Sequence, residues 1–255
     1  MRHAALTAAA SALLLCAGCK PAAAVGQAPV PPAAGADAAR PAGGLTVQAQ
    51  PDLGPQNQAM PRFSGGDAAA TARINLAMDK LDALTREGLG ACPDMPHGGQ
   101  TQAVRVTRNA PLLAIEVTYE SDCGAYPSSG INSYVFDPAT GALIDWARAL
   151  PEAGVTAGEP DTEMFTNAFT SASIQARLVA AARKQSDADW RNDCLPVLEG
   201  QDLSLTARIN TETHTLDITP DLPHVVQACG DSLSLGTADL TALKADPRLI
   251  EAVRQ

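Results

Sequence analysis

The stretch that decides the fold runs from Cys92 to Trp146 and reads CPDMPHGGQTQAVRVTRNAPLLAIEVTYESDCGAYPSSGINSYVFDPATGALIDW. Within it, residues 101–108 and 112–120 alternate between apolar and polar side chains, as β-strands with one buried face do. The sequence Asn109-Ala110-Pro111 between them is typical of a turn. The stretch therefore predicts an antiparallel β-hairpin with one cysteine before it and another after it.

A second hairpin is predicted within the same stretch, from residues 131–136 and 142–146. Asp137-Pro138-Ala139-Thr140-Gly141 lies between these strands, and it combines an acceptor side chain, a fixed φ and a glycine for the positive-φ position. One carboxylate without alternating Asp or Asn residues argues against a calcium loop. Residues 124–130 are then the loop between the two hairpins. On the first hairpin, Glu116 and Glu120 share a strand face that we expect to contact water.

Helices are predicted on both sides of the hairpins. Residues 67–87 form an amphipathic helix that begins at Asp67 as N-cap. Residues 161–186 are expected to be largely helical, with a break near Thr170-Ser171, and a last helix begins at Asp246-Pro247. The fold class is therefore α+β, with antiparallel hairpins packed against two or three helices. The buried stripe of the first helix is expected to contain Ile74, Ala77, Met78, Leu81 and Leu84.

The N-terminus carries an export signal. Met1-Arg2-His3 is a short basic start, and the apolar run Ala4–Leu15 is shorter than the 20 or so residues that span a bilayer. The sequence Ala17-Gly18-Cys19 that follows resembles the cleavage site of a bacterial lipoprotein signal. An ordinary secreted protein that is cut nearby is the alternative.

The lipoprotein resemblance implies a signal peptide of residues 1–18 and lipid, such as palmitate, on Cys19. Lipid at this position anchors a chain to a membrane without spanning it. In enteric lipoproteins an aspartate after the lipidated cysteine causes retention at the inner membrane. Lys20 stands there in this chain, which implies the periplasmic face of the outer membrane of a Gram-negative bacterium.

The sequence between the signal and the hairpins changes composition near Phe63. Residues 19–62 are rich in Ala, Pro and Gly with few large apolar side chains, which predicts a disordered tether. Residues 63–255 are predicted to be a single folded domain. They hold 14 Lys and Arg against 26 Asp and Glu, a net charge of −12. Such a charge opposes binding to nucleic acid and favours cationic partners, although solubility alone also explains it.

The chain after residue 150 repeats the order of the part before it. Each part has a helical stretch, a cysteine, a predicted hairpin and a Cys-Gly pair, and the later hairpin comprises residues 203–210 and 213–219. We therefore hypothesise two related α-β-β units, about 63–150 and 151–255.

Of the six cysteines, Cys16 leaves with the signal and Cys19 receives lipid, so four remain for pairing. An even number in an oxidising compartment indicates two disulfides. Three pairings exist. A hairpin brings the residues before and after it together, which favours Cys92–Cys123, and the repeated order favours Cys194–Cys229.

No catalytic, metal or nucleotide motif stands out, so we predict no catalytic residue, metal site or cofactor and favour a non-enzymatic role. His97, His214 and His224 have no partners at ligand or triad spacing. Tyr126, Ser128 and Ser129 are the candidate binding residues, because loops on rigid scaffolds often bind ligands. A buried Tyr126 with a satisfied hydroxyl is the alternative.

Two patterns resemble a known family. Cys123-Gly124-Ala125-Tyr126-Pro127 and, after a strand, Phe136-Asp137-Pro138-Ala139-Thr140-Gly141 are similar to the Gly-Gly-Ala-His-Pro and Phe-Asp-x-x-Thr-Gly patterns of one extracytoplasmic domain. That domain of unknown function occurs in RsiV-type anti-sigma factors and PdaC-type peptidoglycan deacetylases. The resemblance implies an α+β fold and contact with the cell wall or with wall-degrading enzymes.

We therefore expect a lipid-anchored envelope protein that binds the cell wall or a cationic, lysozyme-like wall hydrolase. Two alternatives remain open. One is an envelope hydrolase with an unrecognised active site, and the other is a structural lipoprotein without a ligand.

Overall fold

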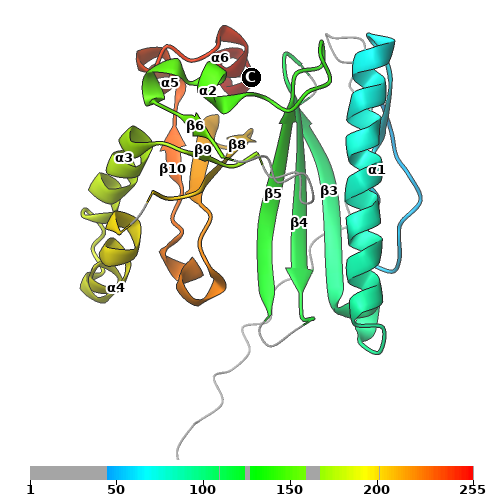
Figure 1. The fold of residues 1–255 in the computed structure, drawn as a ribbon, viewed down its shortest axis with the longest axis horizontal. Coiled ribbons are helices and arrows are strands. Elements are labelled where there is room, and N and C mark those ends of the chain that lie inside the picture. Colours follow the sequence, from blue (N-terminus) through cyan, green and yellow to red (C-terminus); the bar gives the residue numbers. More distant parts are fainter. Residues whose placement is uncertain (1–44, 109, 124–126, 159–166, 201, 255) are drawn as a thin grey trace, which may run out of the picture. The chain divides into compact units, whose positions relative to one another are not determined.

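Two larger antiparallel β-sheets, a two-stranded sheet and the helices beside them make up the described fold (Figure 1). The computed structural model describes residues 45–108, 110–123, 127–158, 167–200 and 202–254. All of them belong to one unit of the chain. The predicted α+β class is confirmed. None of the helices in these described ranges is long and apolar enough to cross a membrane.

The first sheet contains β3 (Gln100–Arg108), β4 (Leu113–Ser121) and β5 (Ser128–Phe136), in that order. Helix α1 (Ala68–Ala91) lies along one face of this sheet (Figure 1). The helix begins where the Asp67 side chain accepts a hydrogen bond from the Ala70 amide at 2.8 Å, as predicted. The predicted hairpin of β3 and β4 is confirmed. The core between helix and sheet includes Ile74, Met78, Leu81, Ile115, Val117, Tyr134 and Phe136.

The predicted tether ends earlier than the sequence suggests, because residues 45–62 are folded. Strand β1 (Leu45–Gln48) pairs with β2 (Arg62–Gly65), and both Leu45 and Met60 are 1% exposed. The buried Asp82 carboxylate of α1 accepts hydrogen bonds from the Met60 amide and the Arg62 guanidinium, both at 2.7 Å. The segment has few apolar residues, but Leu45, Ala59 and Met60 among them are buried, and composition alone does not reveal this. The lipidation candidate Cys19 lies outside the described residues.

The second sheet has the strand order β10-β9-β8-β7-β6. Its central pair, β8 (Leu205–Asn210) and β9 (Thr215–Pro220), confirms the later predicted hairpin. The shorter strands are β6 (Thr156–Ala157), β7 (Phe169–Thr170) and β10 (Leu233–Leu235). The helices beside this sheet are α2 (Trp146–Ala149), α3 (Ala172–Ala182), α4 (Ala188–Glu199), α5 (Thr237–Ala242) and α6 (Pro247–Arg254). Three short 3-10 helices are described: η1 (Pro96–Gly99) before β3, and η2 (Pro151–Ala153) and η3 (His224–Cys229) in the later half.

A second apolar core joins the two halves of the chain. Leu112, Ala114 and Val135 of the first sheet contribute to the same buried cluster as Leu205, Leu216 and Ile218 of the second. In addition, Arg108 Nε donates a hydrogen bond of 2.9 Å to the Ala252 carbonyl of α6. The remaining large members of this core are Trp146, Leu150, Phe169, Ile174, Leu178, Leu198, Leu235, Leu240, Leu249 and Val253.

Both predicted disulfides are present, Cys92–Cys123 and Cys194–Cys229. Each links a helix to the segment after the second strand of a hairpin. In both halves a helix is followed by three antiparallel strands, so the hypothesised α-β-β order has a further strand in each case. Cys92 is the C-cap of α1, whereas Cys194 lies inside α4, which continues through Pro196 to Glu199. In the second half the cysteine therefore does not follow the helical stretch, as the predicted repeat has it, but lies within the helix.

The predicted hairpin of residues 131–136 and 142–146 was wrong in its second strand. Only the bridge between Phe136 and Leu143 forms, and the chain then enters α2. The Asp145 side chain accepts hydrogen bonds from two amides and starts this helix, an N-cap that competes with strand formation. The turn itself is as predicted: Gly141 has φ 71°, and a Cβ there would lie 2.2 Å from the Ala70 carbonyl oxygen.

Three further expectations differ from the structure in detail. Strand β5 begins at Ser128, so residues 128–130 belong to the strand and not to a loop. Residues 169–170 form β7, and residues 159–166 of the expected helical stretch lie outside the described residues. Leu84 is 37% exposed, because the buried face of α1 ends with Leu81 and Asp82.

Candidate binding groove

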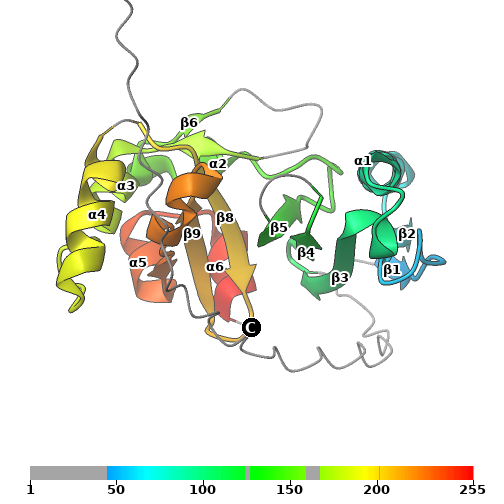
Figure 2. The same ribbon diagram turned by 90° about the horizontal axis from the view of Figure 1, so that it is seen from below.

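An open groove lies between β5 and the β8–β9 hairpin. It has a volume of about 260 Å³. Strands β5 and β8 are neighbours in the structure, and the view from below shows β5 on the side of its sheet that faces β8 (Figure 2). Residues 131–135 of β5 and residues 206–208 of β8 form its two walls. Trp146, Asn167, Thr219 and Ser232 complete the lining.

Two buried polar atoms of the groove lining have no hydrogen-bond partner in the described part of the chain. They are Trp146 Nε1 and Ser133 Oγ. Trp146 is 3% exposed and packs against Phe169 with 5.9 Å between the ring centroids. Such orphaned groups are uncommon in folded proteins, because each loses its hydrogen bonds to water on burial. Two of them in one groove indicate a place where a ligand or ordered water completes the hydrogen bonding.

The remaining polar groups of the lining are mainly amides and hydroxyls. The Asn167 side-chain nitrogen donates to the Ile144 carbonyl at 2.6 Å, which fixes its position beside Trp146. The hydroxyls of Thr219 and Ser232 are 2.6 Å apart. Burial raises the pKa of Tyr134 to about 12, with a smaller contribution from Tyr119. The Tyr134 hydroxyl is neutral at physiological pH, and Arg208 is the charged side chain of the groove lining.

A charged network crosses from one sheet to the other at the groove. Glu116, which is 5% exposed, accepts from Arg105 at 3.0 Å and lies 3.9 Å from Arg208. Arg208 also pairs with Asp217 at 3.1 Å, and Arg105 with Glu212 at 3.5 Å. The expectation that Glu116 faces water was wrong, because the second sheet covers it. Its strand neighbour Glu120 is exposed.

Asp217 is the most fully bonded carboxylate of this network. It is 4% exposed and accepts from Asn210, Thr215 and Ser234 at 2.7–2.8 Å. Burial alone would raise its pKa. The hydrogen bonds from Asn210, Ser234 and Thr215, together with the Arg208 charge, outweigh burial and hold the pKa of Asp217 below its ordinary value.

Replacing Asp217 by asparagine is therefore expected to make stability less dependent on acid. A carboxylate whose pKa is lowered in the folded state stabilises above its unfolded pKa, near 4, and this contribution disappears as pH falls through the folded pKa. We expect Asp217→Asn to lose about 2 kcal/mol at pH 7 and much less at pH 2. Urea unfolding at both pH values measures this, with the exposed Asp221→Asn as control. An unchanged difference between pH 7 and pH 2 in Asp217→Asn would contradict it.

The structure places the predicted site residues unevenly. Tyr126 lies outside the described residues. Ser128 and Ser129 are the first residues of β5, pair with Ser121 and Glu120 of β4, and lie outside the groove lining. Sequence reasoning missed Trp146, Asn167 and Ser133. One signal for the position of Trp146 was present in the sequence. Asp145 before it is a suitable N-cap residue, but residues 142–146 were assigned to a strand.

Neither His97 nor His214 lines the groove. His97 lies in η1 and His214 in the turn after β8, and both have positive φ values of 57° and 55°. The backbone of His224 begins η3. In the described ranges, no group of three His, Cys, Asp or Glu residues is arranged to hold a metal ion.

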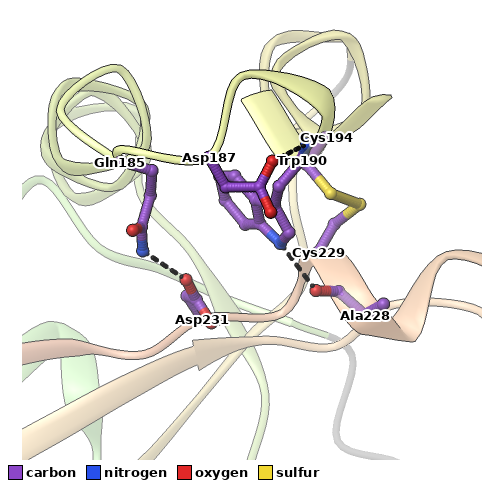
Figure 3. The surroundings of a disulfide bond; sticks show 7 residues. All are labelled: Gln185, Asp187, Trp190, Cys194, Ala228, Cys229 and Asp231. Carbon is purple, nitrogen blue, oxygen red and sulfur yellow. Dashed lines mark hydrogen bonds between the residues drawn. A yellow bond between two sulfur atoms is a disulfide. The ribbon is translucent and has the colours of Figure 1, made fainter. Parts of the chain in front are cut away.

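The Cys194–Cys229 disulfide is embedded in a small set of polar contacts (Figure 3). Trp190 lies beside it, and its Nε1 donates to the Ala228 carbonyl at 3.1 Å. Gln185 donates to Asp231 at 2.8 Å, which links the α3–α4 connection to the segment before β10. Asp187 begins α4 by accepting from the amides of Asp189 and Trp190. These contacts hold η3 against α4.

No family model matches the chain, and no match was found among curated proteins or among solved structures.

Proposed function

We propose that this chain is a lipid-anchored binding module on the periplasmic face of the outer membrane, and that the groove between β5 and β8 is its ligand site. Its partner is the cell wall or a cationic wall hydrolase of the lysozyme kind. The protein binds this partner without chemical conversion. The export signal, the acidic charge and the resemblance to the extracytoplasmic domain support the location and the class of partner.

The observation that carries this proposal is the pair of unpartnered groups, Trp146 Nε1 and Ser133 Oγ, in an open groove. Both atoms are buried, so a ligand with hydrogen-bond acceptors satisfies them once neighbouring side chains of the groove move aside. The Trp146 ring is itself buried, and its position is fixed by Phe169 and by the N-cap residue Asp145. The amide and hydroxyl side chains around it suit recognition by hydrogen bonds.

The charge of the folded domain supports a cationic partner. With the domain now beginning at residue 45, it holds 15 Lys and Arg against 27 Asp and Glu, so the net charge is still −12. Such a field increases the association rate with a cationic protein and loses effect as salt rises.

Filling the groove is expected to weaken partner binding at least roughly tenfold. Ser232 is an exposed lining residue, so Ser232→Trp places a large side chain over the groove without altering the core. Ser186→Trp is the matched control, since Ser186 is exposed in the α3–α4 connection away from the lining. The full-length protein would be assayed for co-sedimentation with insoluble peptidoglycan and for lysozyme binding by calorimetry.

Two results would overturn the proposal. If neither peptidoglycan nor lysozyme binds at micromolar protein, these partners are excluded. If a partner binds and Ser232→Trp binds it as tightly as Ser186→Trp, with both variants folded by circular dichroism, the groove is not the site.

A further inference from the structure

Strand β5 is an edge strand that carries none of the usual protection against pairing with another chain. It forms one edge of the β3-β4-β5 sheet and is nine residues long. Its sequence SSGINSYVF contains no charged residue and no proline. Natural proteins generally shield such edges with charges, prolines or bulges, because unpaired backbone groups recruit further strands. The absence of these devices in β5 indicates an edge that is kept available.

The opposite edge of the same sheet is covered. Gln102 of β3 donates its amide to the Gln56 carbonyl at 2.9 Å and accepts from the Gln58 amide at 3.0 Å. The folded segment 56–58 therefore occupies the β3 edge. On β5, the described chain forms an outward backbone hydrogen bond at the far end, where the Ile144 amide donates to the Val135 carbonyl at 2.8 Å. Strand β8 lies beside the rest of this edge without pairing to it.

The direction of the open backbone groups follows from that one contact. Successive residues of a strand point their N–H and C=O groups to opposite sides. Since Val135 points away from β4, Ser133 and Ile131 also point away from it. In the described ranges neither makes a backbone hydrogen bond on that side. Ile131 is 47% exposed and Asn132 is exposed, so this part of the edge is accessible.

Across the groove, the backbone of β8 faces this edge. On β8, Ser204 accepts from the Asp221 amide, which belongs to the β9 side, so Ala207 points the other way. Ala207, Ser133 and Ile131 all line the groove. A main chain lying along β5 therefore meets the open backbone groups of Ile131 and Ser133 on one side and Ala207 of β8 on the other.

The ends of the strands around the groove are acidic. Glu120 pairs across from Ser129 at the start of β5, and Asp122 follows β4. Asp221 and Asp231 flank η3, between β9 and β10. All four side chains are exposed. Together with the net charge of −12, they favour a segment with basic side chains.

We propose that the groove binds an extended, basic peptide segment of a partner protein, which adds to β5 as a further strand. This inference rests on the proposed function and narrows the partner from envelope material in general to a protein. Main-chain hydrogen bonds to Ile131 and Ser133 supply affinity, and the carboxylates select basic side chains. A glycan strand, which has no peptide backbone, would not form this pairing.

The test uses the full-length protein and the synthetic peptide acetyl-Thr-Lys-Val-Lys-Thr-Lys-amide. Amide hydrogen exchange followed by NMR is expected to show new protection at Ile131 and Ser133. Asn132 and Tyr134 serve as internal controls, because their amides already face β4. The same peptide with N-methylated valine and threonine, or with Glu in place of Lys, is expected to bind at least roughly tenfold more weakly.

A backbone variant separates edge pairing from side-chain contact. Ile131→Pro removes one outward N–H, a change that edge strands tolerate. It is expected to weaken binding of the peptide roughly tenfold. Ile131→Ala truncates the side chain, retains the N–H and is expected to bind nearly as the wild type does.

Each outcome decides the inference. Peptide binding without protection at Ile131 and Ser133, or equal binding by the N-methylated peptide, overturns it. If the peptide fails but peptidoglycan fragments shift the resonances of groove residues, this inference fails while the proposed function stands. If neither ligand affects the groove, both fail.

Discussion

Replacing Asp82 by alanine is expected to destabilise the folded protein by about 3 kcal/mol. Asp82 is 1% exposed, and its carboxylate accepts from the Met60 amide and the Arg62 guanidinium. The alanine leaves a buried backbone N–H without a partner and removes the charge that faces Arg62. Because both partners lie in residues 45–62, this segment is expected to loosen first and to become the preferred site of limited proteolysis.

Asp79→Ala is the matched control, since the same arginine contacts Asp79 at 2.7 Å. Its side chain is 63% exposed, and exposed ion pairs contribute less than about 1 kcal/mol. Urea unfolding of both variants at pH 7 gives the comparison. Equal losses in the two variants would show that residues 45–62 are not held by the buried carboxylate.

Removing the second disulfide is expected to have a comparably large effect. The double replacement Cys194→Ala and Cys229→Ala should lower the free energy of unfolding by about 4 kcal/mol, because the bond closes a loop between residues 35 apart in sequence. The hydrogen bond from Trp190 to Ala228 and the bond from Gln185 to Asp231 would no longer be supported by the cross-link (Figure 3).

The first disulfide supplies the comparison. Cys92 and Cys123 are 31 residues apart, so loop-closure entropy predicts nearly the same loss for their double replacement. Denaturant unfolding of both double variants, with and without reductant, measures the two contributions separately. A loss below about 1 kcal/mol for Cys194→Ala/Cys229→Ala would mean that α4 and η3 hold together without the bond.

The hairpins were predictable because their signals are local. Alternation in residues 101–108 and 112–120 reports which side chains are buried, and the turn residues between the strands fix the register. The hairpin also favoured the pair Cys92–Cys123, and the repeated order of the two halves favoured Cys194–Cys229; the structure contains both pairs. The failed strand at residues 142–146 shows the limit of local evidence. There an apolar run looks like a strand, but the Asp145 cap directs the chain into α2.

The folded segment 45–62 was not predictable from composition. Its burial depends on a few apolar side chains and on Asp82, which lies far along the sequence in α1. Composition averages over a segment, whereas a single buried carboxylate can hold two parts of it in place. The same reason explains Glu116, whose cover comes from Arg208 of the other sheet.

The sequence by itself determined the hairpins of β3–β4 and β8–β9, the acidic charge and the α+β class, because each depends on residues close in sequence or on a simple count. It favoured the observed disulfide pairs among three possible pairings. Only the tertiary structure decided that β5 is an open edge, that segment 56–58 covers the other edge, and that β8 faces the open one. It alone brought Trp146 and Ser133 into one groove with residues 206–208. Packing between separate elements of the chain creates these features, and no pattern within either element records it.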